Sequence, residues 1–578
     1  MAAPAGAPTL VSEIVVLSTA LSAVALSIYV RTLCPSVPGG DSGEMVQVAI
    51  ELGVAHPPGY PTWTLLAHVF SRLPWGEPAW RINLMSAVAD AAASGLLSGA
   101  VGLWAGCAWT GLLAGGAFAF APLVWLYAVQ AEVFALNNAI SALLLLLLVR
   151  FERSRSLGAA CAGACAIGLA MTNQHTLVFF CVPYAMWALV LGRRTLLAPR
   201  ALLCLALSGL LGLSPYLYCV VQGGPDAAWG SWGAQRSVGG LLTHMLRREY
   251  GTFRLANTDS TTDSDFWPRL TAYLTAVPAE LPPYAAPPLG LGLVRSLACA
   301  RLRPLGGVLA AAYLLYVTVF MYLSNLPAGS AFYLQIQQRF WPQPNMLTCA
   351  WFALGTQRAA RALAPHTRAP LAVAALVLVG WHAHLGFEVS EPCNPVPPGC
   401  NPVPHGLQPG AARLQPQRLQ AATLCLQAAA PCTQAGDQSR NDIFRQYGVQ
   451  ILEALPDKPN VLLLTHGDEV CLLCYAHSAV PTLLCPLCCA HSAMLWQWRY
   501  SLQPYLPYLP RLCVPTGAQR GAVRAPRAGG AAKRDRPRPE LYAVRMVRHA
   551  RQAAAVLRGA QLPRRRLRHA ARRRLRDA

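Results

Sequence analysis

Charged residues are scarce in this 578-residue chain: Asp, Glu, Lys and Arg make up only 12% of it, whereas hydrophobic residues make up 54%. A soluble domain carries about 25% charged residues. The shortage excludes an ordinary soluble globular protein, and the mean hydropathy of +0.35 points the same way. We therefore predict an all-α polytopic membrane protein, in which helices satisfy their own backbone hydrogen bonds within lipid.

Long apolar runs are the main structural signal, and they number about eleven. Several of them are close to the minimum of roughly 17 residues for a spanning helix, so the total is uncertain by one or two. The runs cover residues 10–30, 84–104, 107–126, 133–149, 158–172, 176–191, 201–221, 284–300, 305–324, 344–359 and 369–388.

Acidic residues are scarcer still, with 25 Asp and Glu against 47 Lys and Arg, which gives a net charge of +22. From Arg520 onward there are 19 basic and 3 acidic residues, a net +16, so the remaining body carries only +6. The basic excess therefore belongs to the C-terminal tail. An arginine run of this kind suits nucleic-acid binding. The topology derived next argues against that interpretation, and we predict a disordered or anomalous terminus and no nucleic-acid partner.

Lys and Arg are absent from the short loops 127–132 and 172–175, whereas four loops on the opposite side of the predicted spans contain them. Because short basic loops stay in the cytoplasm, the pattern fixes the orientation if the N-terminus is cytoplasmic. The basic loops are residues 150–156, 192–200, 301–303 and 357–368. The segments then placed on the lumenal or extracellular side are residues 37–61, 222–283 and 325–343, and everything after about Phe387.

The first apolar run could instead be a signal peptide, although it lacks a basic region in front and contains Glu13. With either interpretation, the residues that follow it emerge on the non-cytoplasmic side.

The most informative segment for function is residues 37–61, VPGGDSGEMVQVAIELGVAHPPGYP. It is rich in Gly and Pro and contains three ionisable residues, Asp41, Glu44 and His56. Asp41 and Glu44 share one face if the segment is helical. Asp41 could be an N-cap of a helix starting near Met45, or a general base that activates a hydroxyl. His56 could be a loop histidine, a phosphate hydrogen-bond donor or a proton carrier.

Further acids, histidines and arginines are predicted at the same membrane face. Arg81 could snorkel to the interface or bind a phosphate bidentately, and Arg339 is a second candidate for a phosphate. Glu132 and His175 lie at predicted lumenal helix ends, where an acid usually faces a cavity. Arg247 and Arg248 follow an apolar stripe (Leu241, Leu242, Met245 and Leu246) that predicts an interfacial amphipathic helix.

Three classes of function fit these features. A membrane-surface enzyme fits the gathering of ionisable residues at one face. A transporter for a lipid or sugar would more often hold them near the bilayer midplane, within inverted repeats, and no convincing repeat is found. A scaffold that binds partners through its C-terminal region is the third class.

Several motifs resemble, in order, the transmembrane protein 260 family of protein O-mannosyltransferases, which are GT-C glycosyltransferases. They are GGDSGE, LGVAHPPGYP, RINLMSA (81–87), TNQH (172–175), LLTHMLRREYGTF (241–253) and RFW (339–341). The resemblance covers about residues 10–390 and again 440–469. It implies a GT-C-like fold with a catalytic acid in the first lumenal loop, which corresponds to Asp41, with Glu44 as a supporting charge.

The resemblance also implies a reaction. Mannose would pass from dolichyl phosphate mannose, as substrate, to Ser or Thr hydroxyls of secretory or cell-surface proteins, among them receptor IPT domains. The site would lie at the lumenal face of the endoplasmic reticulum membrane, and the displacement would invert the anomeric centre. The leaving phosphate needs cations, for which the candidates are Arg81, Arg339, His56 and His175, in that order. No lumenal DxD motif is present, so we expect no required metal and no cofactor.

The resemblance fades after about Glu469. We predict a catalytic membrane domain at 1–390, a disordered linker at 391–436, a partial lumenal soluble region at 437–515 and the Arg-rich tail at 516–578. Four cysteines have the C-x₂-C spacing of zinc sites, yet disulfides are favoured in an oxidising lumen, and a repeat-derived artefact stays open. These cysteines are Cys471, Cys474, Cys485 and Cys488.

Overall fold

The computed structural model describes residues 7–224, 227–228, 231–248, 251–252, 255, 265–389, 462–466 and 469–473. The chain divides into two units, Met1–Ile451 and Leu452–Ala578, which are described separately. Several predictions fall outside the described residues. They are the domain boundaries between 390 and 437, the tail after 516, and the cysteines Cys474, Cys485 and Cys488.

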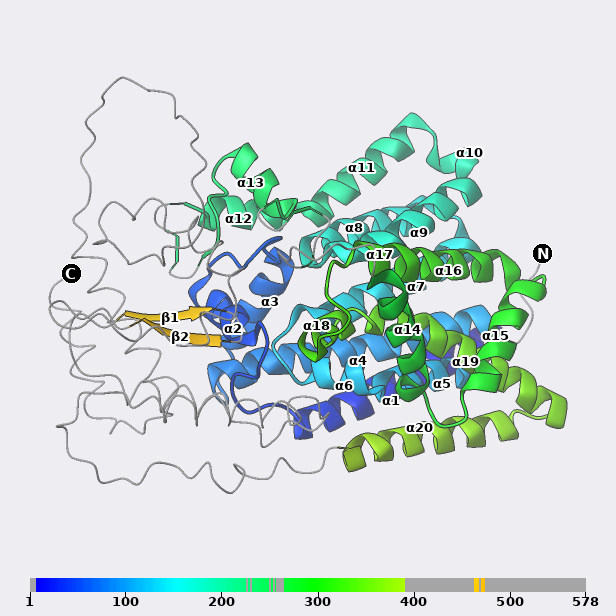
Figure 1. The fold of residues 1–578 in the computed structure, drawn as a ribbon. Coiled ribbons are helices and arrows are strands. Elements are labelled where there is room, and N and C mark those ends of the chain that lie inside the picture. The colour runs from blue at the N-terminus through cyan, green and yellow to red at the C-terminus, as the bar shows by residue number, and fades with distance from the viewer. Residues whose placement is uncertain are drawn as a thin grey trace, which may run out of the picture. The chain divides into compact units, whose positions relative to one another are not determined.

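Helices build the first unit (Figure 1), and many of them are apolar. By length and composition, five of the described helices can cross a membrane, or seven if each of two bent pairs is one span. The five are α1 (Ala7–Arg31), α4 (Pro78–Ala105), α7 (Val133–Ser154), α16 (Arg303–Leu315) continued by η4 (Tyr316–Phe320) and α17 (Met321–Leu323), and α20 (Ala369–Val389). The bent pairs are α5 (Ala108–Ala119) with α6 (Pro122–Ala128), and α11 (Pro199–Leu213) with α12 (Tyr216–Gln222).

The prediction of a polytopic helical protein is confirmed for this unit, but the count of eleven spans is not. Each apolar run coincides with a helix or a bent pair, yet four of these helices do not meet the length and composition of a full span. Helices α8 (Leu157–Asn173), α9 (Val178–Leu191) and α15 (Ala286–Ala298) are short, and α19 (Pro342–Leu363) is long but polar, with buried Gln343, Asn345 and Gln357.

Helix α4 lies at the centre of the core and packs against α1, α5 and α7. Small residues such as Ala93, Ser94, Ala100 and Ser98 are buried along it, so its neighbours approach closely. Close approach between small residues is how membrane helices gain van der Waals contact without a hydrophobic driving force. The core therefore fixes the start of α7, directly before which Glu132 lies.

Short helices connect these long ones. They are α2 (Ser42–Glu51), α3 (Pro61–Ser71), η1 (His175–Leu177), α10 (Arg193–Leu196), α13 (Val238–Met245), α14 (Phe266–Ala276), η3 (Val277–Glu280) and α18 (Ala331–Gln338). Helices α2, α3 and α13 gather on the left of Figure 1, and α10 lies at the opposite end of the unit.

Helix α13 is the amphipathic helix that the sequence predicts at Leu241–Leu246. Ser237 caps it, because its Oγ accepts a hydrogen bond from the Gly240 N–H at 3.0 Å. Leu241 and Met245 pack against a small core of Val54, Tyr216 and Cys219, whereas Leu242 is 42% exposed.

In the second unit the described residues form a two-stranded antiparallel hairpin of β1 (Leu462–His466) and β2 (Glu469–Leu473), with Leu464 paired to Cys471. The all-α prediction did not include these strands.

Candidate active site

The backbone at Gly40 and Asp41 starts α2. Gly40 has φ +74°, in the left-handed region, and Asp41 occupies the N-cap position of a helix that begins at Ser42. The Asp41 side chain makes no capping hydrogen bond. Asp41 therefore occupies the N-cap position that the sequence allowed, but its carboxylate does not cap the helix.

The Asp41 carboxylate forms an ion pair with Arg339, which directly follows α18. Arg339 Nη1 donates to Asp41 Oδ2 at 3.0 Å, and it also lies 4.0 Å from Oε1 of Glu132. The Asp41 side chain is 36% exposed, whereas Arg339 is 14% and Glu132 only 3% exposed. Asp41 is thus the member of this triad that an external molecule can reach.

Glu132 holds the triad together from the start of α7. Its Oε1 accepts a hydrogen bond from the Asp41 backbone N–H at 3.1 Å, and the Trp63 Nε1 donates to its backbone carbonyl at 3.0 Å. A Cβ on Gly40 would lie 2.9 Å from Glu132 Oε1 and 3.0 Å from Arg339 Nη2. Only glycine at position 40 leaves room for both side chains.

The charges around Asp41 favour its ionised form. Burial raises the pKa of Asp41, but the positive charges of Arg339, His56 and Arg247 outweigh burial and lower the pKa below its usual value. Asp41 is therefore a carboxylate at neutral pH, as a base must be.

A second acid–cation pair lies in the same segment. Glu44, in the first turn of α2, accepts hydrogen bonds from the His56 backbone N–H at 2.7 Å and from His56 Nδ1 at 3.1 Å. The other ring nitrogen of His56 lies 3.2 Å from the Tyr60 hydroxyl. Burial lowers the pKa of His56, but Glu44 and Tyr60 raise it well above its usual value. His56 is therefore an imidazolium that also acts electrostatically on Asp41.

Hydrogen bonds from the segment 231–244, which follows α12, hold the loop that contains His56 in place. His244 Nε2 donates to the Ala55 carbonyl at 3.0 Å, the Trp232 N–H donates to the Val54 carbonyl at 2.9 Å, and Ser231 Oγ accepts from the Val54 N–H. Burial lowers the pKa of His244 to about 4, so the ring is neutral. The sequence interpretation missed His244, although it lies within the leucine stripe that it singled out.

Of the remaining predicted site residues, some lie near the Asp41–Arg339 ion pair and others lie elsewhere. Arg247 acts electrostatically on Asp41, whereas Arg248 is exposed. Arg81 donates hydrogen bonds to the backbone carbonyls of Ser71, Trp75 and Gly76 at 2.6–3.2 Å, which closes the turn between α3 and α4.

His175 is also held locally. The Tyr216 hydroxyl donates to the Met171 carbonyl, so His175 Nε2 is the donor in its 3.0 Å contact with that hydroxyl. The structure thus unites Asp41, Glu44, His56, Glu132, Arg247 and Arg339, but does not bring Arg81 or His175 into hydrogen-bonding contact with them.

Comparisons with known proteins agree with the motifs. Residues 41–197 match the family described as "Protein O-mannosyl-transferase TMEM260 N-terminal domain". The chain is 36% identical over 353 residues to protein O-mannosyl-transferase tmem260 of Dictyostelium discoideum, and 35% identical over 349 residues to its Mus musculus counterpart. These matches cover 57% and 58% of this chain but only 43% and 49% of the relatives, so the chain spans about half of their length.

A solved structure also aligns with the chain. It is that of ArnT from Cupriavidus metallidurans bound to undecaprenyl phosphate, with a TM-score of 0.44 and 14% identity over 76% of this chain and 79% of that chain. The resemblance indicated by the motifs is confirmed by the sequence comparisons: the membrane part of this chain is similar to the protein O-mannosyl-transferases of the TMEM260 family.

Proposed function

We propose that the protein is a glycosyltransferase of the GT-C class that transfers mannose from dolichyl phosphate mannose to Ser or Thr hydroxyls. Its acceptors would be secretory or cell-surface proteins, among them receptor IPT domains, at the lumenal face of the endoplasmic reticulum membrane. The similarity to named O-mannosyl-transferases supports the reaction class. The observation that carries the proposal is the exposed Asp41 carboxylate, which forms an ion pair with Arg339.

Asp41 acts as the base in this proposal. Its carboxylate takes the proton of the acceptor hydroxyl while the hydroxyl oxygen forms a bond to the anomeric carbon. The bond from that carbon to the phosphate oxygen breaks, and the electron pair leaves with dolichyl phosphate. A single displacement of this kind inverts the anomeric centre, and atoms and charge balance without a redox partner.

Two cations of the cluster can stabilise the leaving phosphate. Arg339 presents a planar guanidinium that matches phosphate oxygens, and it already lies beside Asp41. His56 supplies a second positive charge because Glu44 keeps its pKa high. Arg81 and His175 remain predictions as phosphate ligands. Since these cations supply positive charge, the proposal includes no metal and no cofactor.

Glu132 is a positioning residue in this arrangement. It accepts from the backbone N–H of Asp41 and lies against Arg339, so it fixes the base and the cation relative to one another. Removing its charge would take away one of the two carboxylates that lie beside the Arg339 guanidinium. We expect Glu132→Gln to lower kcat more than it raises KM for the donor.

The decisive experiment replaces Asp41 by Asn, which keeps the shape and an oxygen for Arg339 but cannot take a proton. Membranes containing the full chain are assayed with a lipid-linked mannose donor and an IPT-domain acceptor. We expect mannose transfer to be abolished in Asp41→Asn, and to be unchanged in Glu51→Gln, an exposed acid at the end of the same helix.

Two results would contradict the proposal. Full transfer by the folded Asp41→Asn variant would remove Asp41 as the base. Flux of donor or sugar in proteoliposomes without any glycosylated product would instead support the transporter class.

A further inference from the structure

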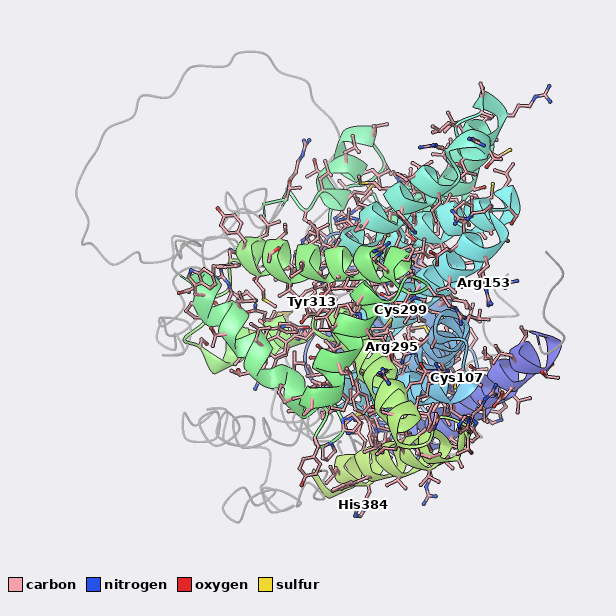
Figure 2. The ribbon with its side chains drawn as sticks, turned by 90° about the vertical axis from the view of Figure 1, so that its right-hand side faces the viewer. Cys107, Arg153, Arg295, Cys299, Tyr313 and His384 are labelled. Atoms are coloured by element: carbon pink, nitrogen blue, oxygen red, sulfur yellow. The ribbon has the colours of Figure 1, made fainter. Side chains whose placement is uncertain are left out.

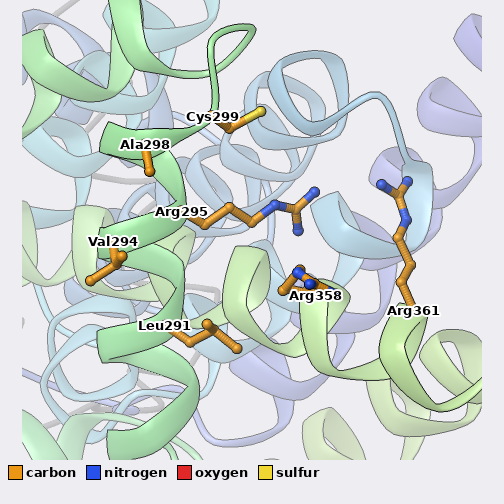
Figure 3. Close-up of a pocket in the computed structure, with 7 residues that line it drawn as sticks. All are labelled: Leu291, Val294, Arg295, Ala298, Cys299, Arg358 and Arg361. Atoms are coloured by element: carbon orange, nitrogen blue, oxygen red, sulfur yellow. The ribbon is translucent and has the colours of Figure 1, made fainter.

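A cluster of arginines lies away from the candidate active site, where α15 and α19 pack together. Arg295, Arg358 and Arg361 line a cavity of about 570 Å³, together with Leu291, Val294, Ala298 and Cys299. Figure 2 looks onto the end of the first unit that lies on the right of Figure 1, and Arg295 and Cys299 are labelled near its centre. In Figure 3 the guanidinium groups of Arg295 and Arg358 lie near the centre of the view, and the Arg361 side chain extends upward to their right.

Two glycines bring these like charges together. A Cβ on Gly292 would lie 1.7 Å from the Trp351 carbonyl oxygen, and one on Gly355 would lie 1.8 Å from that of Pro288. The backbones of α15 and α19 are therefore in direct contact at this pair. Arg295 and Arg358 each follow their glycine by three residues, one helical turn, so the close approach places both arginines at one junction.

The cluster has no internal counter-charge in the part of the chain that the structure describes around the cavity. None of the lining residues is a carboxylate. The groups that act electrostatically on Arg295 are the guanidiniums of Arg361, Arg358 and Arg301, and the thiol of Cys299. Without an acidic residue between them, the guanidinium groups repel one another. A bound anion would offset this electrostatic repulsion.

Ordinary snorkelling does not explain Arg295. A snorkelling side chain extends its charged end into water, but Arg295 is half-buried and its Nη1 donates to the Leu354 carbonyl at 2.8 Å. This bond holds the guanidinium at the wall of the cavity, so one cation of the site is fixed before any ligand arrives.

The surface beside the cavity is apolar. Leu291, Val294 and Leu297 recur every three residues on α15 and are 41%, 63% and 40% exposed. The cavity is an open depression of the surface, so a headgroup can enter it while the hydrocarbon lies on the apolar face beside it. The ligand that fits is an anionic group joined to hydrocarbon, because the arginines match a phosphate and the exposed apolar face matches acyl chains.

We propose that the cavity between α15 and α19 binds the phosphate headgroup of an anionic membrane phospholipid, through Arg295, Arg358 and Arg361. Basic pockets between the helices of membrane proteins are known to recognise such headgroups. The site is separate from the Asp41 cluster, and it does not depend on the proposed transferase activity.

The test compares lipid binding by full-length protein variants purified in detergent, measured by native mass spectrometry during titration with phosphatidylinositol. Arg358→Gln/Arg361→Gln removes two exposed arginines of the cavity and leaves the Arg295 bond intact. Arg193→Gln/Arg194→Gln removes two exposed arginines of α10, at another basic loop, and is the matched control. Phosphatidylcholine and inorganic phosphate are the other two probes.

We expect wild-type protein and the α10 variant to bind phosphatidylinositol equally. The cavity variant should bind it about 25-fold more weakly, at about fivefold for each arginine. Phosphatidylcholine should not distinguish the variants, and equal melting temperatures in phosphatidylcholine would show that the cavity variant is folded. Equal loss in both double variants would overturn the proposal. So would inorganic phosphate binding wild-type protein as tightly as phosphatidylinositol, which would mark a site for free anions.

Discussion

Gly40→Ala is the most direct test of how the candidate site is built. Gly40 has φ +74°, where an L-residue costs about 1–2 kcal/mol more than glycine. The added Cβ would also lie 2.9 Å from Glu132 Oε1 and 3.0 Å from Arg339 Nη2. Glu132 is only 3% exposed and cannot swing into solvent, so its hydrogen bond from the Asp41 N–H is weakened, at about 1 kcal/mol.

The expected total is a loss of about 2–3 kcal/mol in folding free energy. The fall in mannose transfer should be larger, because displacing one stabilising donor from a charged site lowers kcat by about 10²–10³. Thermal melting in detergent and transfer assays in membranes measure the two effects. Gly43→Ala is the matched control, since Gly43 lies in the first turn of α2 and its Cβ would meet only the Val37 side chain, at 3.8 Å. Wild-type stability and activity in Gly40→Ala would refute the steric argument.

Three further predictions concern the surroundings of the cluster. Glu44→Gln removes the main cause of the raised His56 pKa. The stabilisation from that pair is complete between about pH 5 and 6.5 and is lost as pH rises through the folded-state pKa. The melting-temperature gap between wild type and variant should therefore shrink in alkali, and a constant gap would contradict this. His244→Phe should expose residues 231–248 to limited proteolysis, whereas Arg248→Gln should not. Arg81→Gln should lower stability by about 1–3 kcal/mol and leave the donor KM unchanged; the reverse result would restore Arg81 as a phosphate ligand.

The helices were largely predictable, but their lengths were not. Apolar runs mark where helices occur, because burial in lipid demands continuous apolar sequence. Whether a run spans depends on bends such as the 69° turn between α5 and α6, which composition does not record. Helix α19 is long enough to span, but it contains buried polar residues. One of them, Gln343, donates a hydrogen bond to Asn138 inside the bundle, and the apolar pattern of the sequence does not record this contact.

The members of the site were predictable by type, and their pairing was not. The charge rule placed Asp41 and Arg339 at one membrane face, but their contact joins residues 298 positions apart, which no local pattern encodes. Arg81 and Arg339 look alike in sequence as cations at helix ends. Only coordinates distinguish a guanidinium that donates to backbone carbonyls from one that faces a carboxylate.

The Asp41–Arg339 ion pair has a consequence for the order of events in the proposed transfer reaction. While the guanidinium is paired with the Asp41 carboxylate, its positive charge weakens that carboxylate as a base. A donor phosphate that shares Arg339 withdraws part of this positive charge, and the affinity of Asp41 for a proton increases. The resting protein would thus keep its base inactive, and arrival of the lipid-linked sugar would itself switch the base on for the acceptor hydroxyl.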